Sequence, residues 1–339
     1  MEISQFGDFN GQAVKKFRLT NAGGFSIEVM NWGATLVKCT APVPGEGGRD
    51  LMLGFPEFDE YPAKSPYFGA TCGRFANRIA NGQFEIDGTV HNVDRNQNGQ
   101  HHLHGGTDNF SKRVWYDSPK TECNSVKFAL VSDDGDQGYP GKVTATCEYQ
   151  LRDDNCLVIQ MRAATTETTL INLAHHSYWN LDSKQGGWPT VDQHRLWLAA
   201  DHYLPTGAGQ IPTGEIRPVD GTEFDFRNER QLNDAGEPNF DHCFCVAGAS
   251  ELRPIARLRS SDQRVSMLIK SNQPAVQFYS GFKLDIAARS GHIGPRSGLC
   301  LETEKYPNAP NEPNFPSAFL VPGQTYNHVM EHYFYVSDG

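Results

Sequence analysis

Apolar and polar residues alternate along many short segments of the chain, the period expected when one face of a β-strand is buried. Residues 25–29 read Phe-Ser-Ile-Glu-Val, and residues 265–269 read Val-Ser-Met-Leu-Ile. Both segments are predicted to be strands. No stretch of eleven or more residues fits the helical period better than the strand period, so helices are expected to be few and short.

Turn residues join some of these segments into predicted hairpins. The Asp-Gly pair at 87–88 separates two apolar segments, and this dipeptide favours the tight turn of a two-residue hairpin. The Asp-Asp-Asn triplet at 153–155 separates residues 149–151 from 157–161 in the same way. Many short strands between turn clusters predict an all-β sandwich or barrel. Because no linker or composition shift divides the chain, we expect a single domain over residues 1–339.

Composition and charge narrow the possible partners. The 339 residues carry a formal net charge of −10, and no cluster of Lys and Arg marks a nucleic-acid groove or an anionic membrane surface. We therefore expect no nucleic acid and no membrane as partners. The N-terminal residues lack the pattern of a signal peptide, and the eight cysteines are scattered as in proteins of reducing compartments. Together these features predict a cytoplasmic location.

A carboxyl group interrupts the apolar pattern of residues 299–304. If this segment is extended, Cys300, Glu302 and Glu304 share one face, and the two carboxylates lie roughly 7 Å apart. Each then opposes ionisation of the other, which suits a base with a raised pKa. The alternative interpretation is an edge strand with a solvated acidic face.

Four other segments place hydrogen-bonding side chains beside glycine or aromatic residues, the mixture that a neutral polyol requires. Simpler interpretations exist for their members: Arg78 as a surface ion-pair partner, Asp241 as a turn cap, and a lone histidine as a structural residue. His175 and His176 face opposite sides of an extended segment, so only one of them can reach a given pocket. The segments are residues 73–79, 101–106, 172–180 and 240–242.

Other kinds of catalytic centre receive little support. His102 and His104 share one side of an extended segment, but neither an HExxH motif nor a paired CxxC motif accompanies them. Ser177 lacks the glycines of a nucleophile elbow, and no dinucleotide-binding fingerprint is present. A glutamate, one or more histidines and sugar-friendly polar groups remain. This set is typical of acid-base catalysis without a metal.

An ordered series of motifs resembles the aldose 1-epimerase (galactose mutarotase) family along nearly the whole chain. The resemblance implies a large antiparallel β-sandwich, no metal or cofactor, a monomer, and interconversion of the α and β anomers of free aldohexoses such as galactose and glucose. The motifs are GRFANRI at 73–79, LHGG at 103–106, NLAHHSYWN at 172–180, YLP at 203–205, IPTGE at 211–215, FDH at 240–242, VQFY at 276–279 and LET at 301–303.

Carried over by position, the resemblance implies that Glu302 is the general base and His176 the general acid, with His104 assisting near the ring oxygen. A carboxylate that removes the anomeric proton and a protonated histidine that protonates the ring oxygen suffice to open a cyclic hemiacetal. Both groups are expected to have pKa values near neutrality. The residues that the resemblance implies for binding sugar hydroxyls are Asn77, Arg78, Asp241 and Gln277.

Two features depart from the family pattern. Glu304 stands where the family commonly has glutamine, and we expect its charge to raise the pKa of Glu302. Residues 285–296 look like an insertion and are expected to shape the pocket rim. The preferred hexose depends on pocket geometry, which the sequence leaves open.

Two alternative functions stay open on the same fold. A hexose-6-phosphate 1-epimerase would need several arginines around the phosphate, and Arg74, Arg78 and Arg113 are available. A non-catalytic sugar-binding protein is the other alternative, since a fold does not fix function. Such a protein would be expected to lack Glu302 or His176, and both are present.

Overall fold

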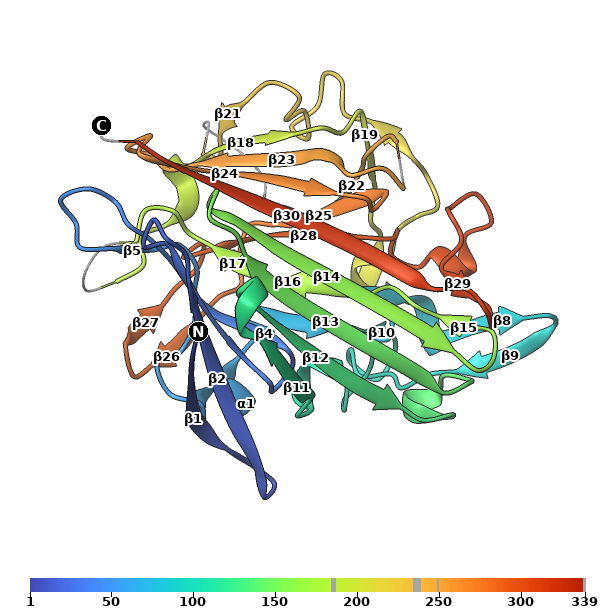
Figure 1. Ribbon diagram of the computed structural model, residues 1–339. Helices are drawn as coiled ribbons and strands as arrows, with labels where there is room; N and C mark the ends of the chain where they lie inside the picture. The colour runs from blue at the N-terminus through green and yellow to red at the C-terminus, as the bar shows by residue number, and fades with distance from the viewer. Residues whose placement is uncertain (184–186, 234–238, 249, 338–339) are drawn as a thin grey trace.

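The computed structural model describes residues 1–183, 187–233, 239–248 and 250–337, and strands dominate it (Figure 1). Its only α-helix in these residues is α1 (Glu60–Lys64), and no helix there has the length and apolar character to cross a membrane. The predicted all-β class with few, short helices is confirmed. Short 3₁₀ turns occur at Ala80–Gly82, Phe110–Lys112, Thr121–Cys123, Asp136–Gly138, Val191–Gln193, Ala208–Gln210 and Ala309–Asn311.

Two large antiparallel sheets form the sandwich. In spatial order, the nine-stranded sheet contains β11 (Tyr116–Lys120), β12 (Ser125–Ser132), β13 (Val143–Leu151), β14 (Cys156–Thr165), β30 (Tyr326–Val336), β24 (Val265–Ser271), β23 (Arg253–Arg259), β18 (Arg195–Leu198) and β21 (Arg230–Gln231). The six-stranded sheet contains β17 (Tyr178–Trp179), β28 (Leu299–Glu304), β25 (Ala275–Tyr279), β22 (Asp241–Cys245), β19 (His202–Leu204) and β20 (Arg217–Pro218).

Smaller sheets complete the described fold. The N-terminal five-stranded sheet contains β1 (Glu2–Phe9), β2 (Gln12–Thr20), β3 (Ser26–Met30), β4 (Thr35–Ala41) and β5 (Arg49–Asp50). The two-stranded pairs are β6 (Ala70–Cys72) with β16 (Ala174–His176), β7 (Arg78–Ile79) with β10 (His102–Leu103), β8 (Gln83–Ile86) with β9 (Thr89–Asn92), β15 (Thr169–Leu170) with β29 (Phe319–Leu320), and β26 (Ile286–Ala288) with β27 (Gly291–Ile293).

The strands and hairpins predicted from alternation are confirmed. β3 and β24 cover the two segments with a period of two, and β13 and β14 form the second predicted hairpin. Asp87 and Gly88 join β8 to β9 with φ values of 49° and 79°. Positive φ at both central residues is the conformation of the tight hairpin turn that this dipeptide favours.

The main core lies between the two large sheets and continues onto the N-terminal sheet. Along β13 every second residue is buried, and its neighbours face outward. One continuous apolar cluster joins Leu36 of β4, Ile159 of β14 and Leu301 of β28. Burial of this surface, at about 25 cal/mol per Å², is the main force that holds β28 in place. The six-stranded sheet is therefore a rigid support for side chains on its other face.

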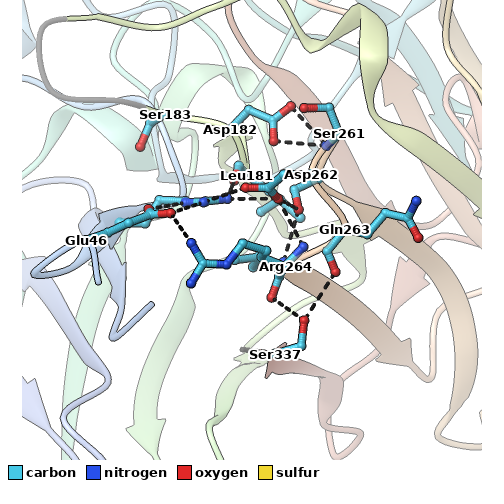
Figure 2. A network of polar contacts seen from close by, with 12 residues as sticks. Glu46, Leu181, Asp182, Ser183, Ser261, Asp262, Gln263, Arg264 and Ser337 are labelled. Carbon is cyan, nitrogen blue, oxygen red and sulfur yellow. Dashed lines mark hydrogen bonds and ion pairs between the residues drawn. The ribbon is translucent and has the colours of Figure 1, made fainter. Parts of the chain in front are cut away.

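A polar network fastens the N-terminal sheet to the turn between β23 and β24 (Figure 2). Arg49 is 5% exposed, and its guanidinium contacts Glu46 at 2.5 Å and Asp262 at 2.6 Å. The same guanidinium donates to the Leu181 carbonyl at 3.1 Å, and Arg264 also contacts Glu46 at 2.7 Å. Because Arg49 lies between two carboxylates, its removal leaves both without their closest cation.

Replacing Arg49 with methionine is therefore expected to lower the free energy of unfolding by about 2–3 kcal/mol, measured by urea denaturation. Arg227 provides the control, because its ion pairs with Asp220 and Asp225 lie at the surface. Arg227→Met should cost much less. Equal losses in the two variants would contradict a special role for the buried network.

Candidate active site

A cavity of about 190 Å³ lies beside the six-stranded sheet, and all seven predicted site residues line it. Its volume is roughly that of six water molecules, which suits one small polyol. Five further residues complete the described wall. The predicted residues are Asn77, Arg78, His104, His176, Asp241, Gln277 and Glu302, and the others are Pro66, Tyr67, Tyr178, Tyr279 and Lys283.

A larger hollow of about 940 Å³ lies elsewhere, next to the network around Arg49, and it contains none of the predicted residues. Its charged side chains already have partners: Lys16 pairs with Glu28 at 2.8 Å, and Lys38 pairs with Asp50 at 3.2 Å. The smaller cavity contains all seven predicted residues, among them Glu302, whose Oε2 has no hydrogen-bond partner among the described residues. We therefore assign the chemistry to the smaller cavity.

The strand register of the six-stranded sheet brings two predicted residues together. Glu302 lies directly opposite Gln277 in the ladder between β28 and β25. Alternation along β28 places Glu302 and Glu304 on one face, whereas Leu301 faces the apolar core. β28 lies between β17 and β25, and Glu302 and Glu304 are 2% and 0% exposed. The alternative of an edge strand with a solvated acidic face is therefore wrong.

Two loop segments supply Asn77 and His104 through reciprocal contacts. The Asn77 N–H donates to His104 Nδ1 at 3.2 Å, and the His104 N–H donates to the Asn77 carbonyl at 2.9 Å. Both residues have positive φ, 63° and 50°. Residues other than glycine rarely adopt this backbone conformation, and such residues are concentrated at functional sites. Because Nδ1 of His104 accepts a hydrogen bond, the proton of the neutral ring lies on Nε2.

Glu302 is a buried carboxyl group without a hydrogen-bond partner for Oε2 among the described residues. His176 Nε2 lies 3.6 Å from this oxygen. Burial raises the pKa of Glu302, the negative charges of Glu304 and Asp241 raise it further, and Arg78 opposes the shift. An unpaired buried oxygen is costly, so this atom is suited to accept a hydrogen bond from a bound hydroxyl.

Two tyrosine rings stack on the His176 ring. Tyr67 lies 5.6 Å away at an interplanar angle of 24°, and Tyr178 lies 5.2 Å away at 22°. Burial lowers the pKa of His176 to about 4. The expectation that this histidine keeps a pKa near neutrality is therefore wrong. Burial disfavours the charged forms of both His176 and Glu302.

The residues expected to hold sugar hydroxyls form one connected set. Arg78 Nη1 donates to Asn77 Oδ1 at 3.2 Å, and Arg78 Nη2 lies 3.8 Å from Asp241 Oδ2. Gln277 Nε2 donates to Asp241 Oδ1 at 2.8 Å. The side chains of Arg78 and Asp241 are 12% and 13% exposed. Their simpler interpretations, a surface ion pair and a turn cap, are therefore wrong.

Metal ligation by His102 is not supported, because both of its ring nitrogens have protein partners. Nδ1 lies 2.6 Å from the Asp94 carbonyl, and Nε2 lies 2.5 Å from the Tyr139 hydroxyl. Within the described chain, ligand atoms of His176, Cys300 and Glu302 lie within 4.8 Å of one another. Burial raises the pKa of the Cys300 thiol, and a thiol must lose its proton to bind a metal. We therefore interpret these three residues as part of an acid-base site and not as metal ligands.

Some cavity residues were not predicted. Tyr279 shares a face of β25 with Gln277, and Tyr178 follows His176 by two positions, so alternation within the quoted motifs could have indicated them. Tyr67 had no such signal. It lies in the loop after α1, and no periodic pattern connects that loop to the six-stranded sheet.

Residues 285–296 form a hairpin of β26 and β27, which packs on α1. Arg289 pairs with Asp59, and Lys64 Nζ donates to the Ala287 carbonyl at 2.7 Å. None of the described cavity-lining residues belongs to this segment, so it does not form the rim directly. Through α1 it braces the loop that carries Tyr67.

Comparisons with known proteins agree with this fold. The aldose 1-epimerase family model matches residues 15–333. The chain is 39% identical to galactose mutarotase of Sus scrofa and 35% identical to aldose 1-epimerase of Escherichia coli, in each case over 96% of both chains. The solved structure of a GalM/aldose epimerase homologue from C. elegans superposes with a TM-score of 0.89, at 30% identity over 96% of this chain and 99% of that one. The fold and relatives define an isomerase of the mutarotase class, which acts on small-molecule sugars. The chain belongs to the aldose 1-epimerase family.

The stacking of Tyr67 on His176 leads to a test. Removing the ring with Tyr67→Leu is expected to lower epimerase kcat about tenfold, because the His176 imidazole loses one of the two tyrosine rings that fix its orientation. Tyr67→Phe keeps the ring and should stay within about twofold of wild type. The measurement is steady-state anomer interconversion. If phenylalanine were as harmful as leucine, the hydroxyl and not the ring would be responsible.

Proposed function

We propose that the protein interconverts the α and β anomers of free aldohexoses, including galactose and glucose, by acid-base opening and closing of the sugar ring. Glu302 and His176 are the catalytic pair in this proposal. The observation that carries it is the unpaired, buried Glu302 Oε2 at 3.6 Å from His176 Nε2, in a cavity of the size of one sugar. The curated relatives named galactose mutarotase support the choice of substrate.

In the reaction, ionised Glu302 accepts the proton of the anomeric hydroxyl, and protonated His176 donates a proton to the ring oxygen. The bond between C1 and the ring oxygen breaks, and the electron pair of the O1–H bond becomes the C1 carbonyl. Rotation about the C1–C2 bond then presents the other carbonyl face. On closure, His176 removes the hydroxyl proton and Glu302 returns a proton to O1. Both residues regain their starting states, so the cycle needs no added reactant.

Sugar binding must stabilise the charged forms of both catalytic groups. Burial disfavours these forms, whereas the reaction starts with ionised Glu302 and protonated His176. A hydroxyl that donates to Glu302 stabilises the carboxylate, and a ring oxygen that accepts from His176 stabilises the imidazolium. The distance of 3.6 Å between His176 Nε2 and Glu302 Oε2 is short enough for a proton to pass between the two residues after a small movement. The two tyrosine rings stacked on the imidazole add cation–π stabilisation to its charged form.

The remaining predicted residues are proposed to bind and orient the sugar. His104 presents an Nε2–H group near the ring oxygen, and its ring lies 5.1 Å from that of His176. Asn77, Arg78, Asp241 and Gln277 offer donors and acceptors on the same cavity wall. Directed contacts of this kind discriminate hydroxyl positions better than apolar walls do.

Two of the three arginines considered for binding the phosphate of a phosphosugar are not available for that role. Arg74 is 1% exposed and donates to the carbonyls of Asp133 and Gly141, so it is a structural residue. Arg113 is paired with Asp136 at 2.7 Å. Of the three candidates, only Arg78 lines the cavity. One guanidinium that already contacts Asp241 is a poor phosphate site.

We also propose that the chain is one domain over residues 1–339, works as a cytoplasmic monomer without metal or cofactor, and binds neither nucleic acid nor membrane. The continuous core supports the single domain. The eight cysteines are free thiols and seven of them are buried, which supports a reducing compartment. The net charge of −10 disfavours polyanionic partners.

Glu302→Gln tests the base directly. The variant keeps the side-chain shape but cannot accept the anomeric proton, so turnover should fall by at least about 10³-fold. Galactose should still bind with a Kd within about tenfold of wild type, since the hydroxyl-binding residues are intact. Polarimetry of fresh α-D-galactose measures turnover, and calorimetry measures binding. Retained turnover would refute Glu302 as the base.

Substrate class is tested by comparing fresh α-D-galactose, α-D-glucose and α-D-glucose 6-phosphate at equal concentrations in a weakly catalytic buffer. The free hexoses are expected to give kcat/KM values at least about tenfold above the phosphosugar, because one paired guanidinium does not offset the loss of phosphate hydration. A preference for the phosphosugar would select the alternative. Binding without acceleration of any of the three would select a sugar-binding protein.

A further inference from the structure

Glu304 does not belong to the described cavity wall. It follows Glu302 by two positions on the same face of β28, and it is 0% exposed. Its Oε1 accepts a hydrogen bond from Asn77 Nδ2 at 2.9 Å, and its Oε2 accepts one from Asn172 Nδ2 at 3.4 Å. Both neighbours present donors, and an ionised carboxylate consists only of acceptors. A side-chain amide here would turn its own donor toward one of them.

Contacts continue from Glu304 to the groups that line the cavity. Asn77 donates to Glu304 and accepts from Arg78 at 3.2 Å, so both ends of its amide are fixed. Arg78 in turn approaches Asp241, which accepts from Gln277 at 2.8 Å. Glu304 therefore anchors one end of the hydrogen-bonded set that is proposed to hold the sugar.

Glu302 and Glu304 compete for ionisation, because too few cations lie near them. Three carboxyl groups surround one guanidinium, and Arg78 already lies 3.8 Å from Asp241. Within the described residues, neither Glu302 nor Glu304 has an ion pair with Lys or Arg. Burial raises the pKa of Glu304, and the hydrogen bonds that Asn77 and Asn172 donate to its carboxylate oppose that rise by favouring the ionised form. Ionising either carboxyl group therefore makes the other harder to ionise.

The other titratable neighbours do not supply the missing countercharge. The neighbouring imidazoles are His104 and His176, and burial lowers the pKa of both. Lys305 follows Glu304 in the chain, but its Nζ donates to the Ser317 carbonyl at 3.2 Å. Burial raises the pKa of every thiol and phenol around the pair, which keeps these groups neutral. They are Cys72, Cys243, Cys300, Tyr178, Tyr279 and Tyr326.

We propose that Glu304 is a positioning residue for the epimerase reaction, which orients Asn77 toward the sugar and whose negative charge makes Glu302 a stronger base. This inference rests on the proposed function of Glu302. In wild type, Glu302 should become ionised only at a higher pH than it would beside a neutral residue. Activity that depends on ionised Glu302 therefore falls at a higher pH on the acid side of the profile.

Two variants separate the charge of Glu304 from its hydrogen bond. Glu304→Gln removes the charge but leaves an oxygen for Asn77, so the acid limb of the kcat/KM profile should move to lower pH by about one unit. Glu304→Asp keeps the charge but shortens the side chain. It should leave the acid limb within a few tenths of a unit and raise KM about three- to tenfold, because Asn77 loses its anchor.

Thr303→Val is the matched control. Thr303 lies on the same strand, but its hydroxyl contacts His328 Nε2 at 2.8 Å on the core side. This variant should lower the melting temperature without moving the acid limb, and melting of all variants shows that each is folded. A Glu304→Gln profile that coincides with wild type would overturn the charge effect, as would an equal shift in Thr303→Val. An unchanged KM in Glu304→Asp would overturn the positioning of Asn77.

Glu302→Gln keeps the two proposals apart. If that variant loses turnover while Glu304→Gln keeps the wild-type profile, only the role of Glu304 fails. If Glu302→Gln turns over normally, the proposed function fails, whatever the Glu304 variants do.

Discussion

The site depends on burying the Glu302 carboxyl group without a cation of its own. The carboxyl group is buried, Arg78 lies beside Asp241, and His176 Nε2 lies 3.6 Å from Glu302 Oε2. An arrangement of this kind costs stability, since an unpaired polar atom in the interior loses its hydration. In the proposed reaction, a sugar hydroxyl supplies the missing hydrogen bond and offsets this cost. Binding of the sugar would then also activate Glu302 as the proposed base.

The fold supplies the rigidity that this arrangement needs. β28 lies inside the six-stranded sheet, and Leu301 anchors it in the core while Glu302 faces the cavity. A carboxyl group on a frayed edge would turn toward water, and its pKa would relax. The orientation of the His176 imidazole is likewise fixed, by stacking on the rings of Tyr67 and Tyr178. Preorganised groups of this kind need little rearrangement during reaction.

Alternation along the chain was enough to predict the all-β class, two hairpins and the shared face of Glu302 and Glu304, because each depends only on neighbouring residues. The family resemblance indicated seven residues that the fold brings into one cavity. Tyr67 could not be predicted, since its contact with His176 joins segments more than one hundred residues apart without a local pattern. The lowered pKa of His176 was missed for a related reason. It depends on burial by several elements, which a sequence pattern does not measure.

The charge asymmetry around the cavity also bears on its partners. Three carboxyl groups near one paired guanidinium favour a neutral ligand over an anionic one. Hydroxyl groups can serve every unpaired atom of the wall as either donors or acceptors. A free sugar therefore matches this electrostatic environment better than a phosphorylated one.

In the proposed reaction, the ring opens by cleavage of the bond between C1 and the ring oxygen, and O1 stays on the sugar throughout. The most direct measurement follows α-D-galactose labelled with ¹⁸O at the anomeric hydroxyl, by mass spectrometry, over the first turnovers in unlabelled water. Proton removal from O1 by Glu302 predicts that the label is retained while the anomers interconvert. Loss of label at the rate of interconversion would mean that water replaces O1, and it would contradict the acid-base account.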